Sequence, residues 1–440
     1  MTNQPTLDEN QTSSPTLRAA LLVWLKIGLL SFGGPAAQIG LMHKWVVAEN
    51  KWLSEKQYLN ALSFCMLLPG PEAMQLATYT GWRLHGTLGG IIAGLLFVIP
   101  GAIVIALLAF FYSVYSDVAI VNQLFLGIKA AVIVVVLEAL FRVAKKSLVS
   151  RAQWVIAAVA FVGIFFLDVP FPFIVFAAAL FGYLRGNKDQ ASLTTTDETE
   201  ARPQLNQHLF KSTLTTVFTC VALWISPLLI LYLFTDQTLL VQLGVFFSKL
   251  AVVTFGGAYA VLAYLGQSVV ADFGWLSAGE MMDGLGLAET TPGPLILVTE
   301  FVGFIAGYRE GGLGLALVAA LLTLWVTFVP CFLWIFTGAP FLDWICDQPR
   351  LKGALNAITA AVVGVILNLS VWFALHVLFD QVTRKLYSPF SLWVPDLSSL
   401  NYIVLVLTAL CMVAAFRLHW NIVKILVVSA LLGLGLSAIF

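Results

Sequence analysis

Charged residues are scarce in this chain. Asp, Glu, Lys and Arg make up 10% of its 440 residues, whereas hydrophobic residues make up 60%. Soluble domains carry about 25% charged residues, so the composition lies far outside the soluble range. Many of the apolar stretches approach the ~20 residues that a helix needs to cross a bilayer. The composition therefore predicts an all-α polytopic membrane protein and argues against a soluble domain.

Several signatures of soluble chemistry are also absent. The formal net charge is zero, which gives no reason to expect a nucleic-acid partner. The five cysteines include no CxxC pair, and the five histidines form no HExxH or similar pattern. We therefore expect small core cysteines rather than disulfides, and no metal site. No nucleotide or flavin motif and no nucleophile–base set is visible. We expect neither a cofactor nor enzymatic activity, and we keep an intramembrane enzyme as an alternative.

Two short breaks interrupt apolar stretches, and each break occurs twice. Proline and glycine both disrupt a helix, and in a membrane such breaks survive only where they are buried in protein or line a cavity. The pattern is typical of a transporter whose site is built from broken helices near the membrane midplane. The first break is Ser31-Phe32-Gly33-Gly34-Pro35, repeated as Thr254-Phe255-Gly256-Gly257; the second is Pro69-Gly70-Pro71, repeated as Pro292-Gly293-Pro294.

These breaks belong to an internal duplication. A shift of 223 residues carries both breaks of the first half onto those of the second, and it also carries Trp52-Leu53-Ser54 onto Trp275-Leu276-Ser277. Further along, a shift of 230 residues pairs Pro100 with Pro330. The chain accordingly divides into a polar N-terminal tail (1–16), a first repeat (17–185), a polar cytoplasmic linker (186–212), an extra transmembrane helix (213–236) and a second repeat (237–440).

The first repeat predicts a set of helices that the second should reproduce. A helix over 17–33 is followed by a shorter one over 35–47. The arms 54–68 and 71–84 are each about 22 Å long at 1.5 Å per residue, which is short for an upright span. We expect them to form a hairpin that dips into the membrane. Four full spans should follow, between residues 89 and 184.

Lysine and arginine are distributed unevenly among the loops. With the N-terminus inside, most of these residues fall on the cytoplasmic side, as the positive-inside rule requires. The extra helix then turns the second repeat over, so we expect two inverted-topology repeats. Arg309, Arg384 and Lys385 are the exceptions, because this orientation places them outside.

Two lysines occupy equivalent positions in the two repeats. Lys26 and Lys249 are related by the 223-residue shift, and each lies seven residues before the first glycine of its break. A lysine at the membrane centre costs at least ~2.5 kcal/mol and usually marks a pathway or a partner. The alternative is that both side chains snorkel to the interface. Together with four helix N-termini that begin after the breaks, two ammonium groups favour a doubly charged oxyanion.

Hydroxyl and carboxyl groups complete the candidate site. Ser31, Thr254 and Thr291 lie beside the breaks, where they could bind an anion or bond their own backbone. Glu72 occupies the first turn of an arm, where it could cap the helix or carry a proton, and Glu289 and Glu300 flank the last break. The predicted substrate-binding residues are Lys26, Ser31, Phe32, Gly33, Gly34, Pro69, Gly70, Pro71, Glu72, Lys249, Thr254, Phe255, Gly256, Gly257, Thr291, Pro292, Gly293 and Pro294.

The motifs together resemble the chromate ion transporter family, whose long members carry two homologous domains. The resemblance is carried by Ser31-Phe32-Gly33-Gly34-Pro35, Trp52-Leu53-Ser54, Leu68-Pro69-Gly70-Pro71 and Tyr79-Thr80-Gly81. Ala258 stands where the first half has Pro35, and Leu295 where it has Glu72, so the halves need not act equally.

This resemblance implies a function. It implies a secondary transporter that exports chromate across a bacterial inner membrane and confers chromate resistance, with sulfate as a competing or exchanged anion. The expected partners are chromate or sulfate and the lipid bilayer, and a homodimer is left open. The alternatives are an anion channel built from the same broken helices, a transporter of another dianion such as sulfate, and a chromate-reducing enzyme.

Cysteine labelling tests the predicted orientation. In a background without the native cysteines, Asp272→Cys should react with a membrane-impermeant reagent from the periplasm and Lys51→Cys only from the cytoplasm. The reason is that the inverted arrangement puts these two loops on opposite faces. Labelling of both positions from one side would show that the repeats are not inverted.

Overall fold

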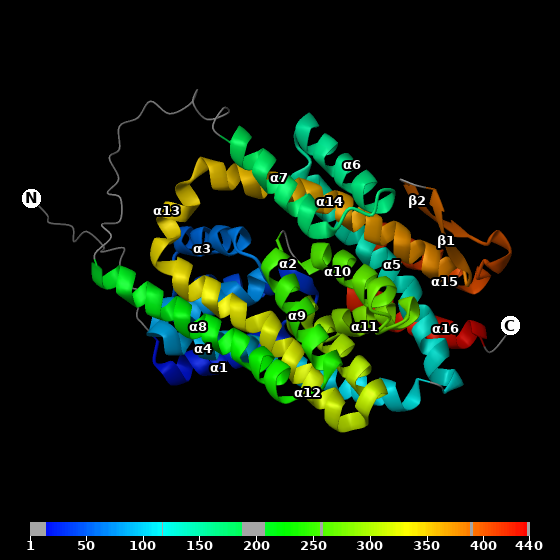
Figure 1. Ribbon diagram of the computed structural model, residues 1–440, viewed down its shortest axis with the longest axis horizontal. Coiled ribbons are helices and arrows are strands. Elements are labelled where there is room, and N and C mark those ends of the chain that lie inside the picture. Colours follow the sequence, from blue (N-terminus) through cyan, green and yellow to red (C-terminus); the bar gives the residue numbers. More distant parts are fainter. Residues whose placement is uncertain (1–14, 117, 187–206, 256–257, 388–389, 438–440) are drawn as a thin grey trace, which may run out of the picture.

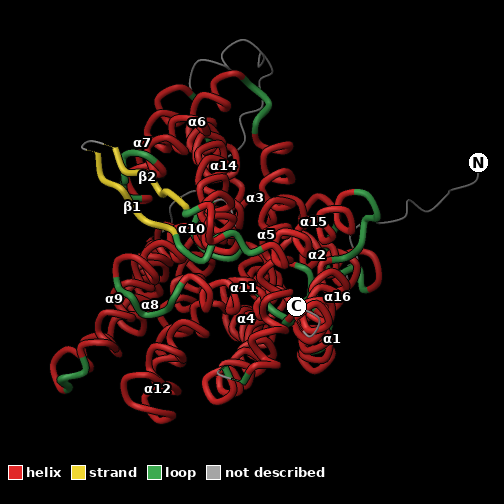
Figure 2. Tube along the Cα trace, turned by 90° about the vertical axis from the view of Figure 1, so that its right-hand side faces the viewer, coloured by secondary structure: helices red, strands yellow, loops and turns green. Residues whose placement is uncertain are grey.

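The computed structural model describes residues 15–116, 118–186, 207–255, 258–387 and 390–437. Within those residues the chain is helical apart from one two-stranded hairpin (Figures 1 and 2). Five of the described helices are long and apolar enough to cross a membrane. The prediction of an all-α polytopic membrane protein is confirmed.

The first half contains seven α-helices. They are α1 (Leu17–Leu30), α2 (Gly34–His43), α3 (Glu55–Leu67), α4 (Glu72–Tyr115), α5 (Ala119–Ser147), α6 (Arg151–Phe165) and α7 (Phe171–Arg185), and α2 continues into a π-helical turn (Lys44–Glu49). Then comes α8 (Gln207–Phe234), which starts inside the stretch that we expected to be linker. Residues 187–206 of that linker lie outside the described residues.

The second half repeats this order. It contains α9 (Thr238–Val253), α10 (Ala258–Gln267) with its own π-helical turn (Ser268–Asp272), α11 (Ala278–Thr290), a 3₁₀ turn (Leu295–Leu297), α12 (Val298–Gly338), α13 (Leu342–Asp347), α14 (Pro349–Leu378), strands β1 (Val382–Tyr387) and β2 (Phe390–Pro395), α15 (Tyr402–Phe416) and α16 (Ile422–Ser437). All four predicted breaks separate consecutive helices.

Each of the two longest helices is in fact a pair of helices. The backbone leaves helical geometry at His85 and Gly86 in α4, and at Gly311 and Gly312 in α12. Gly86 and Gly312 have φ angles of 64° and 67°, in the left-handed region that favours glycine. The first part of α4 therefore ends where the predicted arm 71–84 ends, and a separate long span follows.

The arms fold back on themselves as expected. The rings of Phe64 on α3 and Tyr79 on α4 lie 6.2 Å apart, although Pro69-Gly70-Pro71 separates them in sequence. In the second half, a Cβ atom built on Gly284 of α11 would lie 2.4 Å from the ring of Phe301 on α12. Each Pro-Gly-Pro break is thus the tip of a helical hairpin.

The two halves exchange their last helices. α5 of the first half packs against α15 and α16, whereas α14 of the second half packs against α6 and α7. The approach is very close: a Cβ atom on Gly364 would lie 2.1 Å from the carbonyl oxygen of Ala157, and one on Gly127 would lie 1.9 Å from that of Ser429. Small residues at such crossings let helix backbones touch, which drives packing in membranes. The repeats therefore share one core.

The β-hairpin is an element that the sequence analysis did not predict. Its strands pair antiparallel, and the amide of Ser391 donates to the carbonyl oxygen of Phe166 at 2.8 Å. The hairpin lies at the edge of the molecule in Figure 2. Arg384 in β1 forms an ion pair with Asp168 on the α6–α7 loop, and Arg309 pairs with Glu280. Two of the three exceptions to the charge bias are thus neutralised by a carboxylate.

The crossing of α14 and α6 predicts a position-specific effect on stability. Gly364→Ala should lower the free energy of unfolding by about 1–3 kcal/mol, because the added methyl group overpacks the contact with Ala157. Gly314→Ala on α12 is the matched control, since a Cβ atom there meets nothing within 4 Å. Thermal unfolding of the purified protein measures both. Equal stabilities of the two variants would contradict the crossing.

Candidate functional site

The helix breaks of the two halves bind each other. The amide of Gly293 donates to the carbonyl oxygen of Ser31 at 3.0 Å, and the amide of Gly70 donates to that of Thr254 at 2.7 Å. Each bond joins the Phe-Gly-Gly break of one half to the Pro-Gly-Pro break of the other. The two bonds are equivalent under the 223-residue shift.

We call this junction the break crossing, and it comprises residues 31–34, 69–71, 254–255 and 291–294. The helices that flank it, α2, α10 and α11, lie in the middle of the bundle in Figure 1. It gathers predicted site residues that are more than 200 positions apart in the chain. Gly256 and Gly257, which belong to the predicted set, lie outside the described residues.

Glycines are required at the crossing for two reasons. First, four glycines have φ angles that residues with a side chain rarely adopt. The angles are 85° at Gly33, 78° at Gly34, 123° at Gly70 and 93° at Gly293. In addition, a Cβ atom on Gly101 of α4 would lie 2.1 Å from the carbonyl oxygen of Pro292. Backbones from opposite halves thus touch at this junction.

Two glutamines, which the sequence analysis missed, hold the crossing together. Gln38 on α2 is 1% exposed, and its Nε2 donates to the carbonyl oxygens of Gly293 at 2.6 Å and Ser31 at 3.2 Å. Gln75 on α4 donates to the carbonyl oxygen of Pro69 at 2.7 Å. In the sequence, the signal for their role was an amide side chain in an apolar stretch, one or two helical turns after each break of the first half.

The hydroxyl groups beside the breaks bond their own helices. Ser31 donates to the carbonyl oxygen of Ile27 at 2.5 Å, and Thr254 donates to that of Leu250 at the same distance. Thr291 donates to the carbonyl oxygen of Ala288 at 3.1 Å. The backbone-bonding alternative therefore describes all three hydroxyls, and none of them has its hydrogen free for an anion.

Lysines within the apolar helices differ in their surroundings. The ammonium group of Lys26 lies 3.9 Å from the centroid of the Trp45 ring, and the side chains of Lys26 and Lys249 are both exposed. Lys129 on α5 instead forms an ion pair with Asp283 of α11 at 3.4 Å. The role of Lys26 and Lys249 in anion binding stays a prediction.

Three of the four helix N-termini predicted after the breaks begin at the crossing, whereas the fourth arm starts with the 3₁₀ turn Leu295–Leu297. α2 begins at Gly34 with Pro35 in its first turn, α4 begins at Glu72, and α10 begins at Ala258. The N–H groups of a first helical turn have no intrahelical partner and carry partial positive charge. Glu72 is half-buried in the first turn of α4, where this charge favours a carboxylate.

The structure singles out one carboxyl group near the crossing. Glu289 is 5% exposed, and its Oε1 accepts a hydrogen bond of 2.9 Å from the hydroxyl of Tyr259. That hydroxyl lies 3.6 Å from the position of a Cβ atom on Gly34. The hydroxyl of Tyr259 therefore lies between Glu289 and the N-terminus of α2. Glu300 on α12 is also buried.

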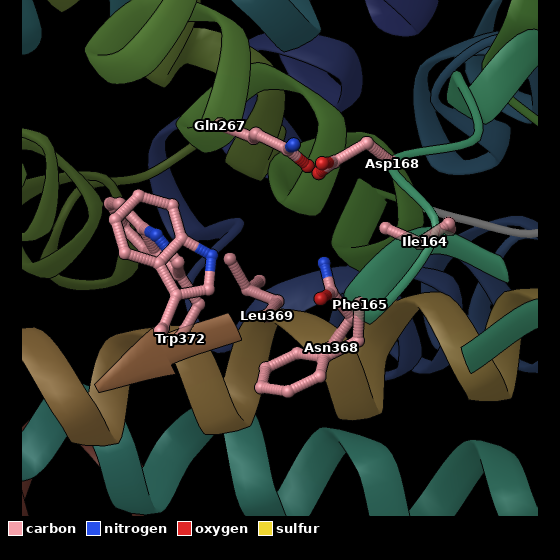
Figure 3. A pocket seen from close by; sticks show the side chains of 8 residues that line it. Ile164, Phe165, Asp168, Gln267, Asn368, Leu369 and Trp372 are labelled. Atoms are coloured by element: carbon pink, nitrogen blue, oxygen red, sulfur yellow. The ribbon is translucent and has the colours of Figure 1, made fainter. Parts of the chain in front are cut away.

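A polar cavity of about 230 Å³ lies elsewhere, between the α6–α7 loop, α10, α14 and β1. Asp168, Gln267 and Asn368 line both it and a smaller adjoining cavity. Figure 3 shows the side chains of Gln267 and Asp168 pointing toward each other at this place. Among the described residues, its lining includes none from the break crossing, so we do not assign it to the predicted site.

Comparisons with known proteins match both halves of the chain. A family model described as chromate transporter matches residues 18–183 and 241–434. A chromate transport protein of Pseudomonas aeruginosa is 33% identical over 351 residues, which cover 78% of this chain and 77% of that protein. One of Cupriavidus metallidurans is 30% identical over 375 residues, 84% of this chain and 86% of that protein. No solved structure matches.

The contacts of Gln38 predict that its amide stabilises the crossing. Gln38→Leu should lower the free energy of unfolding by about 1–3 kcal/mol, because two buried carbonyl groups lose a donor. Gln242→Leu on the exposed side of α9 is the control, and we expect it to leave stability nearly unchanged. Thermal unfolding in detergent compares the two. If Gln38→Leu unfolded like the wild type, these hydrogen bonds would not hold the crossing.

Proposed function

The chain belongs to the chromate transporter family, and from that premise we propose that it is a secondary transporter that exports chromate across a bacterial inner membrane. It is a multi-pass membrane protein, and its family relatives are transport proteins rather than enzymes. The observation that carries the proposal is the break crossing, where both halves contribute backbone to one junction.

We propose that the anion binds at the crossing. Chromate is a tetrahedral dianion whose oxygen atoms accept hydrogen bonds, and the N–H groups of a helix N-terminus suit such a ligand. α2, α4 and α10 all begin there. The N–H groups in the first turns of α2, α4 and α10 would provide most of the contacts, because the neighbouring hydroxyls bond their own helices and the amides of Gly70 and Gly293 already bond the opposite half.

The charge of the ligand needs further compensation. A charge moved from water into the membrane interior costs several kcal/mol even after relaxation. In the proposal, Lys26 and Lys249 supply two positive charges, one from each half, that balance the dianion. Sulfate has nearly the same size and charge as chromate, so we expect it to compete for the site or to exchange across the membrane.

The duplicated architecture supports a carrier mechanism. Secondary transporters commonly place a site between two repeats of inverted topology, and each repeat in turn opens it to one side. The equivalent bonds at Ser31 and Thr254 support such a mechanism, because each half makes the same contact with the other. We therefore propose that the halves are inverted and alternate around the crossing.

The lysine hypothesis predicts a loss of binding. Lys26→Gln and Lys249→Gln should each weaken chromate binding at least tenfold, about 1.4 kcal/mol, because each removes one compensating charge. Lys→Arg at either position should also be poorly tolerated, since a planar guanidinium is not a point charge. Chromate binding to purified protein and chromate resistance of cells with matched expression measure the effect.

Lys424→Gln is the matched control. Its ammonium group lies 3.8 Å from the centroid of the Trp420 ring, much as Lys26 lies over Trp45, but it belongs to α16. We expect this variant to transport normally. If both single Gln variants at Lys26 and Lys249 still protected cells, these lysines would be interfacial anchors. Flux far above carrier rates without counter-transport would instead favour an anion channel.

A further inference from the structure

We propose that Glu289 is a proton-binding site and that its proton is taken up together with the anion. The inference rests on the proposed function and names the ion that accompanies the substrate. Glu289 lies in the last turn of α11, directly before the Thr291–Pro294 break. Its position in the sequence does not distinguish it from the other carboxyl groups, but its contacts do.

The two oxygen atoms of Glu289 differ in their surroundings. Oε1 accepts a hydrogen bond from Tyr259, whereas Oε2 is buried and has no hydrogen-bond partner in the described part of the chain. A buried polar atom without a partner is costly unless something binds to it. A proton on Oε2 removes the charge, while Tyr259 continues to donate to Oε1.

No cation in the described part of the chain neutralises the carboxyl group directly. Among the described residues, no lysine, arginine or histidine nitrogen lies within 4.0 Å of it, and its place at the C-terminus of α11 is the negative end of the helix dipole. The charged side chains that act on it are Arg142 and Glu138 of α5. These two form an ion pair with each other at 2.5 Å, so the charge of Arg142 is largely offset.

Tyr259 connects this carboxyl group to the proposed anion site. Its hydroxyl donates to Glu289 and also lies beside Gly34, at the N-terminus of α2. A dianion bound at that N-terminus would sit about one hydroxyl group away from Glu289. Two negative charges so close repel each other strongly where water is excluded. Anion binding therefore favours the protonated carboxyl, and protonation favours the anion by the same factor.

The neighbouring buried acids lack this combination. Asp283 is paired with Lys129 at 3.4 Å and accepts a hydrogen bond from Tyr112 at 2.8 Å, so a cation already balances its charge. Glu300 is buried on α12, but no hydrogen bond connects it to a residue of the crossing in the described structure. Of these three acids, only Glu289 has both an oxygen atom without a hydrogen-bond partner and a neighbour, Tyr259, that contacts a residue of the break crossing.

Proton uptake on chromate binding tests the inference. Purified protein in weakly buffered solution at alkaline pH, where chromate is a dianion, is mixed with chromate, and a pH indicator reports protons removed from solution. We expect about one proton per bound anion for the wild type. Glu289→Gln mimics the protonated group, so it should bind chromate with an affinity that no longer falls as the pH rises, and it should take up no proton.

Two further variants separate this site from a structural effect. Glu300→Gln removes a buried carboxyl group from the same half and should still take up the proton. Tyr259→Phe removes the donor that stabilises the charged form of Glu289, so proton uptake should persist to a higher pH than in the wild type. An unchanged pH range in this variant would overturn the inference even if Glu289→Gln does not fold. Wild-type protein that binds chromate without proton uptake, or loss of uptake in Glu300→Gln alone, would overturn the inference but leave the transport proposal intact. Absence of chromate binding to the wild type would instead refute the proposed function itself.

Discussion

The backbone of a broken helix must find hydrogen-bond partners without water, and the rest of this structure depends on how that requirement is met. Unpaired N–H and C=O groups cost several kcal/mol in a bilayer. Here each break is completed by the other half of the chain: Gly293 bonds Ser31, and Gly70 bonds Thr254. Each half thus supplies hydrogen-bond partners to the breaks of the other, so the site and the association of the halves have a common physical cause.

The crossing is symmetric in its backbone and asymmetric in its side chains. Gln38 and Gln75 belong to the first half, and the 223-residue shift places Val261 and Val298 at the corresponding positions of the second. Glu289, conversely, corresponds to Met66. The first half thus contributes amides that hold the junction, and the second contributes the carboxyl group beside it. A duplicated site of this kind can separate anion binding from proton binding while keeping both at one place.

Several of the other charged side chains in the described residues are paired with a counter-charge. Lys129 pairs with Asp283, and Arg309 and Arg384 pair with Glu280 and Asp168. Lys26 lies over an aromatic ring instead of a carboxylate. In the described part of the chain, the ammonium group of Lys26 is not paired with a carboxylate, so its charge can still attract an anion. In the proposals, the lysines compensate the charge of the bound anion, and the proton on Glu289 removes a negative charge beside it.

The sequence alone determined the structural class, the positions of the helix breaks and the internal duplication. Scarce charge and long apolar runs required a helical membrane protein, and glycine and proline set the four breaks because they act on their own stretch of backbone. The matching sequences of the breaks in the two halves also indicated the duplication. Only the tertiary structure decided which breaks meet and that Gln38, Gln75 and Glu289 reach the crossing. It also decided that α15 and α16 pack on α5 and that a β-hairpin contacts the α6–α7 loop. These features depend on contacts between residues far apart in the chain. A glutamine in an apolar helix has the same local pattern whether or not a distant carbonyl group lies beside it.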